Sequence, residues 1–199
     1  MNVFFPRIGR NAWPQMIGFA LAGAVVAGGY GILHDEITYS ISSEYFTELK
    51  FAQFSYADFG LGPRVFVAEI GFLATFWVGL LTGWFLARIA VPVLPPLETQ
   101  RLMTIGFTMI LAAACLGGVS GWALGFLRPI SLENSAMAEF AAVCGARDLP
   151  RFVRVAYIHN CGYAGALMGL VFASIYARSR SVQIARQGAL LATPATVSN

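Results

Sequence analysis

Charge is scarce in this 199-residue chain, in which Asp, Glu, Lys and Arg together make up only 12% of the residues. Soluble domains carry about 25% charged residues, so the composition argues against a soluble globular protein. The formal net charge is +3, and no basic cluster is interleaved with aromatic residues, which excludes a nucleic-acid-binding surface. Three cysteines without a C-x-x-C pair argue against a zinc-finger or thioredoxin-type motif.

Apolar residues are abundant instead, at 57% of the chain, and they form long runs without the alternation of strands. A helix needs about 20 apolar residues to cross a bilayer. Four runs meet this requirement, and they cover residues 13–33, 65–87, 102–127 and 152–177. The sequence therefore predicts an all-α integral membrane protein, with four transmembrane helices in a compact bundle over residues 13–177.

The first run has a second interpretation, because a basic start followed by small residues is also typical of a cleaved signal peptide. The apolar part of a signal peptide spans about 7–15 residues, whereas Trp13 to Leu33 contains no charge. Residues 24–29 also make a poor cleavage signal. We therefore expect a retained first helix.

A polar and aromatic connection is expected over residues 34–64, beginning with the charged sequence that follows Leu33. Ser42 or Ser43 is a suitable N-cap for a short amphipathic helix that ends near Tyr56. Its apolar stripe would consist of Tyr45, Leu49, Ala52 and Tyr56. We expect this helix to lie in the lipid headgroup region with its rings inward.

The distribution of arginine predicts the orientation in the membrane. Two arginines lie in residues 1–12 and three in residues 178–199, and basic residues favour the cytoplasmic side. We therefore expect a cytoplasmic N-terminal segment, a cytoplasmic and partly disordered tail, and a plasma membrane location. The short chain with lean loops points to a bacterial inner membrane.

Small residues recur every fourth position in all four predicted spans, which favours close approach of helix backbones inside the bilayer. The rows are Ala20/Ala24/Gly28, Gly79/Gly83/Ala87, Gly117/Gly121/Gly125 and Gly165/Gly169/Ala173. They also predict which face of each helix points into the bundle.

Polar residues are expected on these inward faces, near the extracytoplasmic boundary, where ionisable groups in membranes usually turn away from lipid. The predicted polar layer contains His34, Glu36, Glu69, Ser120, Arg128 and His159. One interpretation of the layer is structural, with an ion pair between Glu69 and Arg128. Another is a transition-metal site for Zn, Fe or Mn, with His34, Glu36, Glu69 and His159 as candidate ligands.

A third interpretation rests on two short motifs. Gly118-Val-Ser120-Gly121 reads as G-x-S-G and His159-Asn-Cys-Gly162 as H-x-x-G, and together they resemble the catalytic pair of rhomboid proteases. The resemblance covers eight residues. It implies an intramembrane serine hydrolase with Ser120 as nucleophile and His159 as its base, acting on peptide or lipid ester bonds.

Two classes of function follow. The first is an accessory or structural subunit, whose partner is another membrane protein or a second copy of the chain. The second is a binding or catalytic protein built on the polar layer. A disulfide between Cys144 and Cys161 is left open.

Overall fold

The computed structural model describes residues 8–128 and 136–192, and within them every regular element is helical. The long helices are α1 (Trp13–Ile41), α3 (Pro63–Ala90), α4 (Pro96–Leu127) and α6 (Leu149–Ala192). All four are long and apolar enough to cross a membrane. Proline occupies the first or second position of α1, α3 and α4, where its missing N–H costs nothing. The predicted class of four long apolar helices is therefore confirmed.

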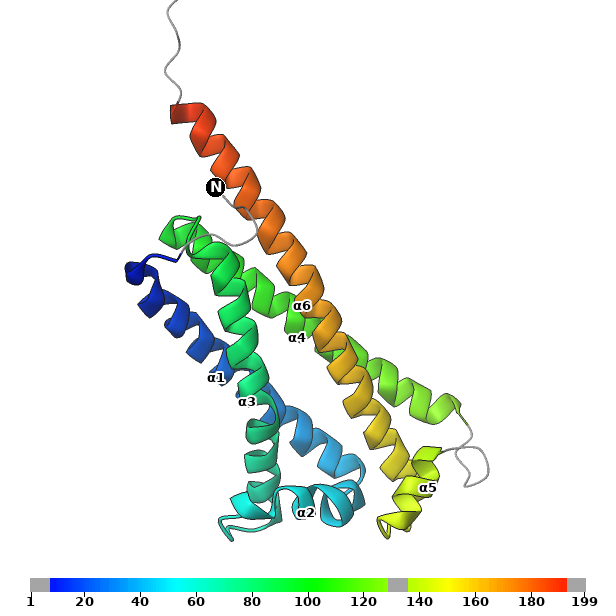
Figure 1. The fold of residues 1–199 in the computed structure, drawn as a ribbon. Helices are drawn as coiled ribbons and strands as arrows, with labels where there is room; N and C mark the ends of the chain where they lie inside the picture. Colours follow the sequence, from blue (N-terminus) through cyan, green and yellow to red (C-terminus); the bar gives the residue numbers. More distant parts are fainter. Residues whose placement is uncertain (1–7, 129–135, 193–199) are drawn as a thin grey trace, which may run out of the picture.

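The helices pack as two pairs, α1 with α3 and α4 with α6, and contacts between the pairs are sparse (Figure 1). The expected compact bundle is thus two helix pairs that leave space between them. Within each pair the small-residue rows let the backbones touch, as predicted. A Cβ at Gly79 would collide with the Gly23 carbonyl, and one at Gly121 with the Tyr157 carbonyl.

The predicted connection at 34–64 begins later than expected, because α1 continues through its charged residues to Ile41. A charged side chain ends a hydrophobic run, but it does not end a helix whose backbone hydrogen bonds continue. The rest of the connection is a π-helical turn, Phe46–Lys50, followed by α2 (Phe51–Gln53) and the 3-10 turn Ser55–Ala57.

The expected apolar stripe of this connection holds only at its start. Tyr45 is buried, but Ala52 is exposed and Tyr56 is 79% exposed. The fully buried ring is Phe46, which lies off the predicted stripe. A π-turn has more residues per turn than an α-helix, so side chains at α-helical spacing do not stay on one face.

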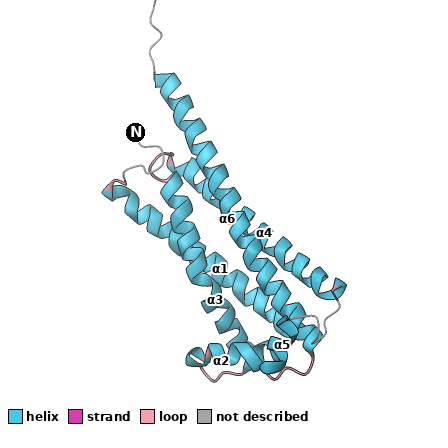
Figure 2. Ribbon diagram, turned by 45° about the vertical axis from the view of Figure 1, so that its right-hand side comes forward, coloured by secondary structure: helices cyan, strands magenta, loops and turns pink. Residues whose placement is uncertain are grey.

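Both views place the connection, α5 (Ala136–Val143) and the start of α6 at one end of the molecule (Figures 1 and 2). The start of α1, the α3–α4 turn and the end of α6 lie at the other end. α6 continues to Ala192, so a helix occupies most of the tail expected to be partly disordered. The loop before α5 lies outside the described residues.

Candidate metal centre

His159 lies on the inward face of α6 and is only 2% exposed. Its Nδ1 lies 3.0 Å from the carbonyl oxygen of Val155, one turn earlier on the same helix. Because a carbonyl oxygen can only accept, Nδ1 carries the proton of this hydrogen bond. The imidazole is therefore held in one orientation, with Nε2 pointing away from its own helix.

The second ring nitrogen, Nε2, faces the carboxylate of Asp35 on α1. Its Oδ1 lies 3.2 Å from Nε2 of His159, while its Oδ2 is buried without a hydrogen-bond partner. The Asp35 residue is 4% exposed. Two lone pairs cannot face each other at this distance, so a proton carried by either group, or a metal ion, must lie between Nε2 and Oδ1.

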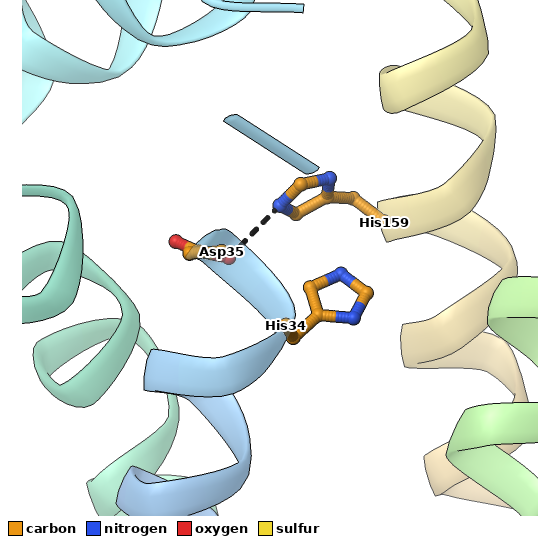
Figure 3. A group of neighbouring side chains, drawn as sticks. All are labelled: His34, Asp35 and His159. Atoms are coloured by element: carbon orange, nitrogen blue, oxygen red, sulfur yellow. Dashed lines mark hydrogen bonds and ion pairs between the residues drawn. The ribbon is translucent and has the colours of Figure 1, made fainter. Parts of the chain in front are cut away.

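His34 precedes Asp35 on α1 and completes the cluster (Figure 3). Its ring lies edge-on to that of His159, with 4.8 Å between the ring centroids. Its Nδ1 lies 3.3 Å from the hydroxyl of Tyr30, one turn earlier on α1. One ligand atom from each of His34, Asp35 and His159 lies within 4.8 Å of the other two. These two imidazoles and one carboxylate match the chemistry of many Zn and non-haem Fe sites.

Aromatic rings from the α1–α3 connection cover the centre on one side. Tyr45 stacks on His159 with 5.0 Å between centroids, and Phe46 approaches the same imidazole edge-on at 6.3 Å. Glu44 anchors these rings, because its Oε2 accepts hydrogen bonds of 2.9 Å from the backbone N–H groups of Arg147 and Asp148. The rings exclude water from His159 on this side.

The centre also borders a cavity of about 100 Å³ between the two helix pairs, and neither Tyr45 nor Phe46 lines it. His34, Asp35 and His159 are part of its wall, and small or apolar residues such as Gly79, Ala114 and Ala166 form much of the rest. An ion held by the three residues would therefore have a free coordination position facing an apolar space.

Glu36, a sequence-predicted ligand, lies outside this centre. Successive helical residues are 100° apart, so Glu36 points away from its neighbour Asp35. Its Oε2 lies 2.6 Å from Nη1 of Arg64 at the start of α3. The same guanidinium also donates to Ser40 Oγ at 3.2 Å. Glu36 thus ties α1 to α3 at the surface and supplies no ligand.

Glu69 and Arg128 do not form the expected ion pair within the described residues. Arg128 is exposed at the end of α4, whereas Oε2 of Glu69 on α3 is buried without a hydrogen-bond partner. Both views place the end of α4 and the start of α3 on opposite sides of the molecule. The prediction failed because helical phase and depth do not tell which helices are neighbours. Glu69 is also absent from the His34–Asp35–His159 cluster.

The structure does not bring Ser120 to His159. The Ser120 side chain is exposed, and its hydroxyl donates to the Leu116 carbonyl at 2.8 Å. The adjacent Gly121 is the residue that packs against α6, at the Tyr157 carbonyl. Ser120 therefore turns away from α6, and both nitrogens of His159 have other partners. The geometry of a serine nucleophile with its base is missing, which removes the structural support for the rhomboid resemblance.

Asp35 is the site residue that the sequence reasoning missed. The row Ala20/Ala24/Gly28 continues along α1, because adding seven residues to Gly28 leads to Asp35. Gly31, Asp35 and Thr38 are all buried on that face. Extending the row past the end of the apolar run would have identified Asp35.

Cys144 and Cys161 are free thiols, so no disulfide joins them. No protein-family model matches the chain, and no curated protein or solved structure is detectably similar to it. The class of protein is therefore described from its own fold and site. Over its described residues it is an all-helical protein with four candidate membrane-spanning helices and a buried cluster of two histidines and one aspartate.

Proposed function

We propose that this protein is an integral membrane protein that binds one transition-metal ion through His34, Asp35 and His159. The observation that carries the proposal is the contact between Nε2 of His159 and Oδ1 of Asp35, both buried, with Oδ2 left without a partner. An uncompensated carboxylate in an apolar interior is costly, and a divalent cation bound to it removes that cost.

The second contact of the His159 imidazole supports this assignment. Metal-binding histidines usually donate their other ring N–H to a carbonyl or carboxylate, which fixes the tautomer. The hydrogen bond from Nδ1 of His159 to Val155 has this form. Metal–ligand bonds are about 2.0–2.2 Å long, so small rotations of the three side chains would bring their donor atoms onto one ion.

Three protein ligands and a free position are typical of catalytic rather than purely structural metal sites. A site with two histidines and one carboxylate suits Zn²⁺ or Fe²⁺. We therefore propose a site at which the ion also binds a small ligand from the adjoining cavity. The protein would lie in a bacterial plasma membrane with both termini cytoplasmic, as the arginine distribution favours.

Elemental analysis of protein purified in mild detergent tests the metal site. We expect close to one equivalent of Zn or Fe per chain, lost on Asp35→Ala and on His159→Ala. Glu36→Gln is the matched control, because it neutralises the next residue on α1 without touching the centre. Protein that is folded but metal-free, even after incubation with Zn²⁺ or anaerobic Fe²⁺, would leave a proton-bridged Asp35–His159 pair and refute the proposal.

An accessory-subunit role is a second proposal, supported by α6, which projects beyond the other helices at its C-terminal end (Figure 1). Such a segment suits docking to another membrane protein. Native purification tests this idea. A reproducible partner lost on deletion of residues 182–199 would support it, and a monodisperse monomer under the same conditions would contradict it.

A further inference from the structure

A lateral groove of about 980 Å³ runs along the outside of the bundle between α3 and α6. Leu73, Phe76 and Trp77 of α3 form one wall, and Leu167 and Leu170 of α6 form part of the other. Ligand pockets typically measure about 300–1,000 Å³. The groove is therefore large enough for an extended apolar molecule.

The groove adjoins the cavity beside the proposed metal centre. Ala74, Thr82, Tyr163 and Ala166 are among the residues that line both spaces. The ring of Tyr163 also lies 6.2 Å from that of His159. A molecule in the groove consequently has an apolar route from the lipid side of the protein to His34, Asp35 and His159.

Lys50 is part of the lining of this apolar groove, and its ammonium forms no salt bridge with the described residues. None of the ion pairs among the described residues includes it, and its ammonium lies 5.7 Å from the centre of the Phe54 ring. Burial lowers the pKa of Lys50, and the negative charge of Asp35 opposes that change. Lys50 is thus a poorly solvated cation, within electrostatic reach of the proposed metal centre.

We propose that the groove binds a single-chain anionic lipid, a free fatty acid, with its carboxylate at Lys50 and its chain between α3 and α6. One unpaired cation complements one carboxylate. The apolar walls of the groove complement an alkyl chain, and the adjoining inner cavity of about 100 Å³ is too small to hold a second one. Binding of the fatty acid in the groove does not depend on the proposed metal site. Any role of the fatty acid as a ligand or substrate at the metal ion does rest on that site.

Photolabelling of the metal-free full-length protein with diazirine-bearing palmitate tests the binding. We expect labelling concentrated in residues 73–82 and 163–170, displaced by excess palmitate and at least tenfold less well by hexadecanol, which lacks the charge. Lys50→Gln should weaken palmitate binding about five- to tenfold, because a charge-assisted contact is lost. Lys50→Arg should retain most of it.

Two alanines of α6 provide a variant that blocks the groove and a matched control that does not. Ala166 lines the groove, whereas Ala164 is exposed outside it. Ala166→Trp should abolish the specific labelling, and Ala164→Trp should leave it unchanged. Lys50→Gln keeps the test decisive if Ala166→Trp does not fold.

Several outcomes would overturn the proposal. These are labelling spread evenly over the lipid-exposed helices, labelling insensitive to Lys50→Gln, or equal displacement by hexadecanol. Displacement by a diacyl phosphatidylglycerol as effective as that by palmitate would refute the single-chain assignment. Metal analysis of the same purified protein, carried out before the metal is removed for labelling, separates the two proposals. Bound metal without palmitate binding refutes only this proposal, and palmitate binding without bound metal refutes only the metal site.

Discussion

The two ends of the helix bundle have cores of different composition. At the end with the short α3–α4 turn, the core consists of aliphatic and sulfur side chains such as Met16, Leu86 and Met103. At the end with the long connection, Tyr45, Phe46 and Phe152 form an aromatic core, and His159 lies in contact with Tyr45 and Phe46. The first core holds helices together, whereas the second also shields a polar cluster.

The largest expected effect is that of Phe46→Ala, which should lower both the stability of the protein and its metal affinity. Phe46→Ala removes a fully buried ring from the connection, where the unfolded segment would meet water. We expect a loss of about 3–5 kcal/mol in the free energy of unfolding. Metal affinity should fall in parallel, because water reaches His159. Unfolding in detergent together with zinc titration measures both, and unchanged metal affinity would show that the aromatic cover is dispensable.

Leu86→Ala is the corresponding change at the aliphatic end. Leu86 is fully buried in α3, a helix long and apolar enough to cross a membrane. Lipid is as apolar as leucine, so chiefly the cavity contributes, and we expect a loss of about 2 kcal/mol. Metal content should stay at the wild-type level. Leu81→Ala, at a position that is 46% exposed, is the control and should have little effect.

Two glycines of α1 differ in how closely another helix packs against them. A Cβ at Gly31 would collide with the Gly71 carbonyl and the Thr75 hydroxyl, whereas a Cβ at Gly29 meets nothing within 4 Å. Gly31→Ala should therefore cost about 1–3 kcal/mol through overpacking. Gly29→Ala should be neutral or stabilise by up to about 1 kcal/mol through helix propensity. Equal unfolding midpoints for the two variants would contradict the close packing of α1 on α3.

The smallest expected effect is on the pH dependence of stability, through the buried Tyr45 hydroxyl. Burial raises the pKa of the Tyr45 hydroxyl above its ordinary value of 10.0. Above about pH 10 the unfolded chain releases this proton and the folded protein keeps it, so stability falls as the pH rises. Tyr45→Phe should make this alkaline decline shallower. Unfolding midpoints measured from about pH 9 to pH 11 test it, and identical slopes would contradict the burial of Tyr45.

Much of the fold could be predicted, because long apolar runs without the alternation of strands favour long helices, and helical spacing shows which residues share a face. Four apolar runs became the four long helices, and the glycine rows became the contacts within each helix pair. The prediction failed where it equated the end of an apolar run with the end of a helix. That error placed Asp35 in the connection, so the row of small residues on the first helix was not extended to it.

The candidate site was predicted only in part. His34 and His159 were both named as metal ligands, and they do lie together. Glu36 and Ser120 were misplaced because adjacent helical positions face in different directions, and Arg128 because the neighbours of α4 were unknown. Periodicity gives the face that a residue occupies on its own helix, but not the element that this face meets.

The four long apolar helices and their packing faces follow from the amino-acid sequence alone, because they depend on local composition and on spacing along one helix. Only the tertiary structure decided that α1 meets α6 at Asp35 and His159 and that the connection covers them with rings. Those contacts join residues more than a hundred positions apart, and the pairing of helices depends on the free energy of the whole packed arrangement rather than on any local pattern.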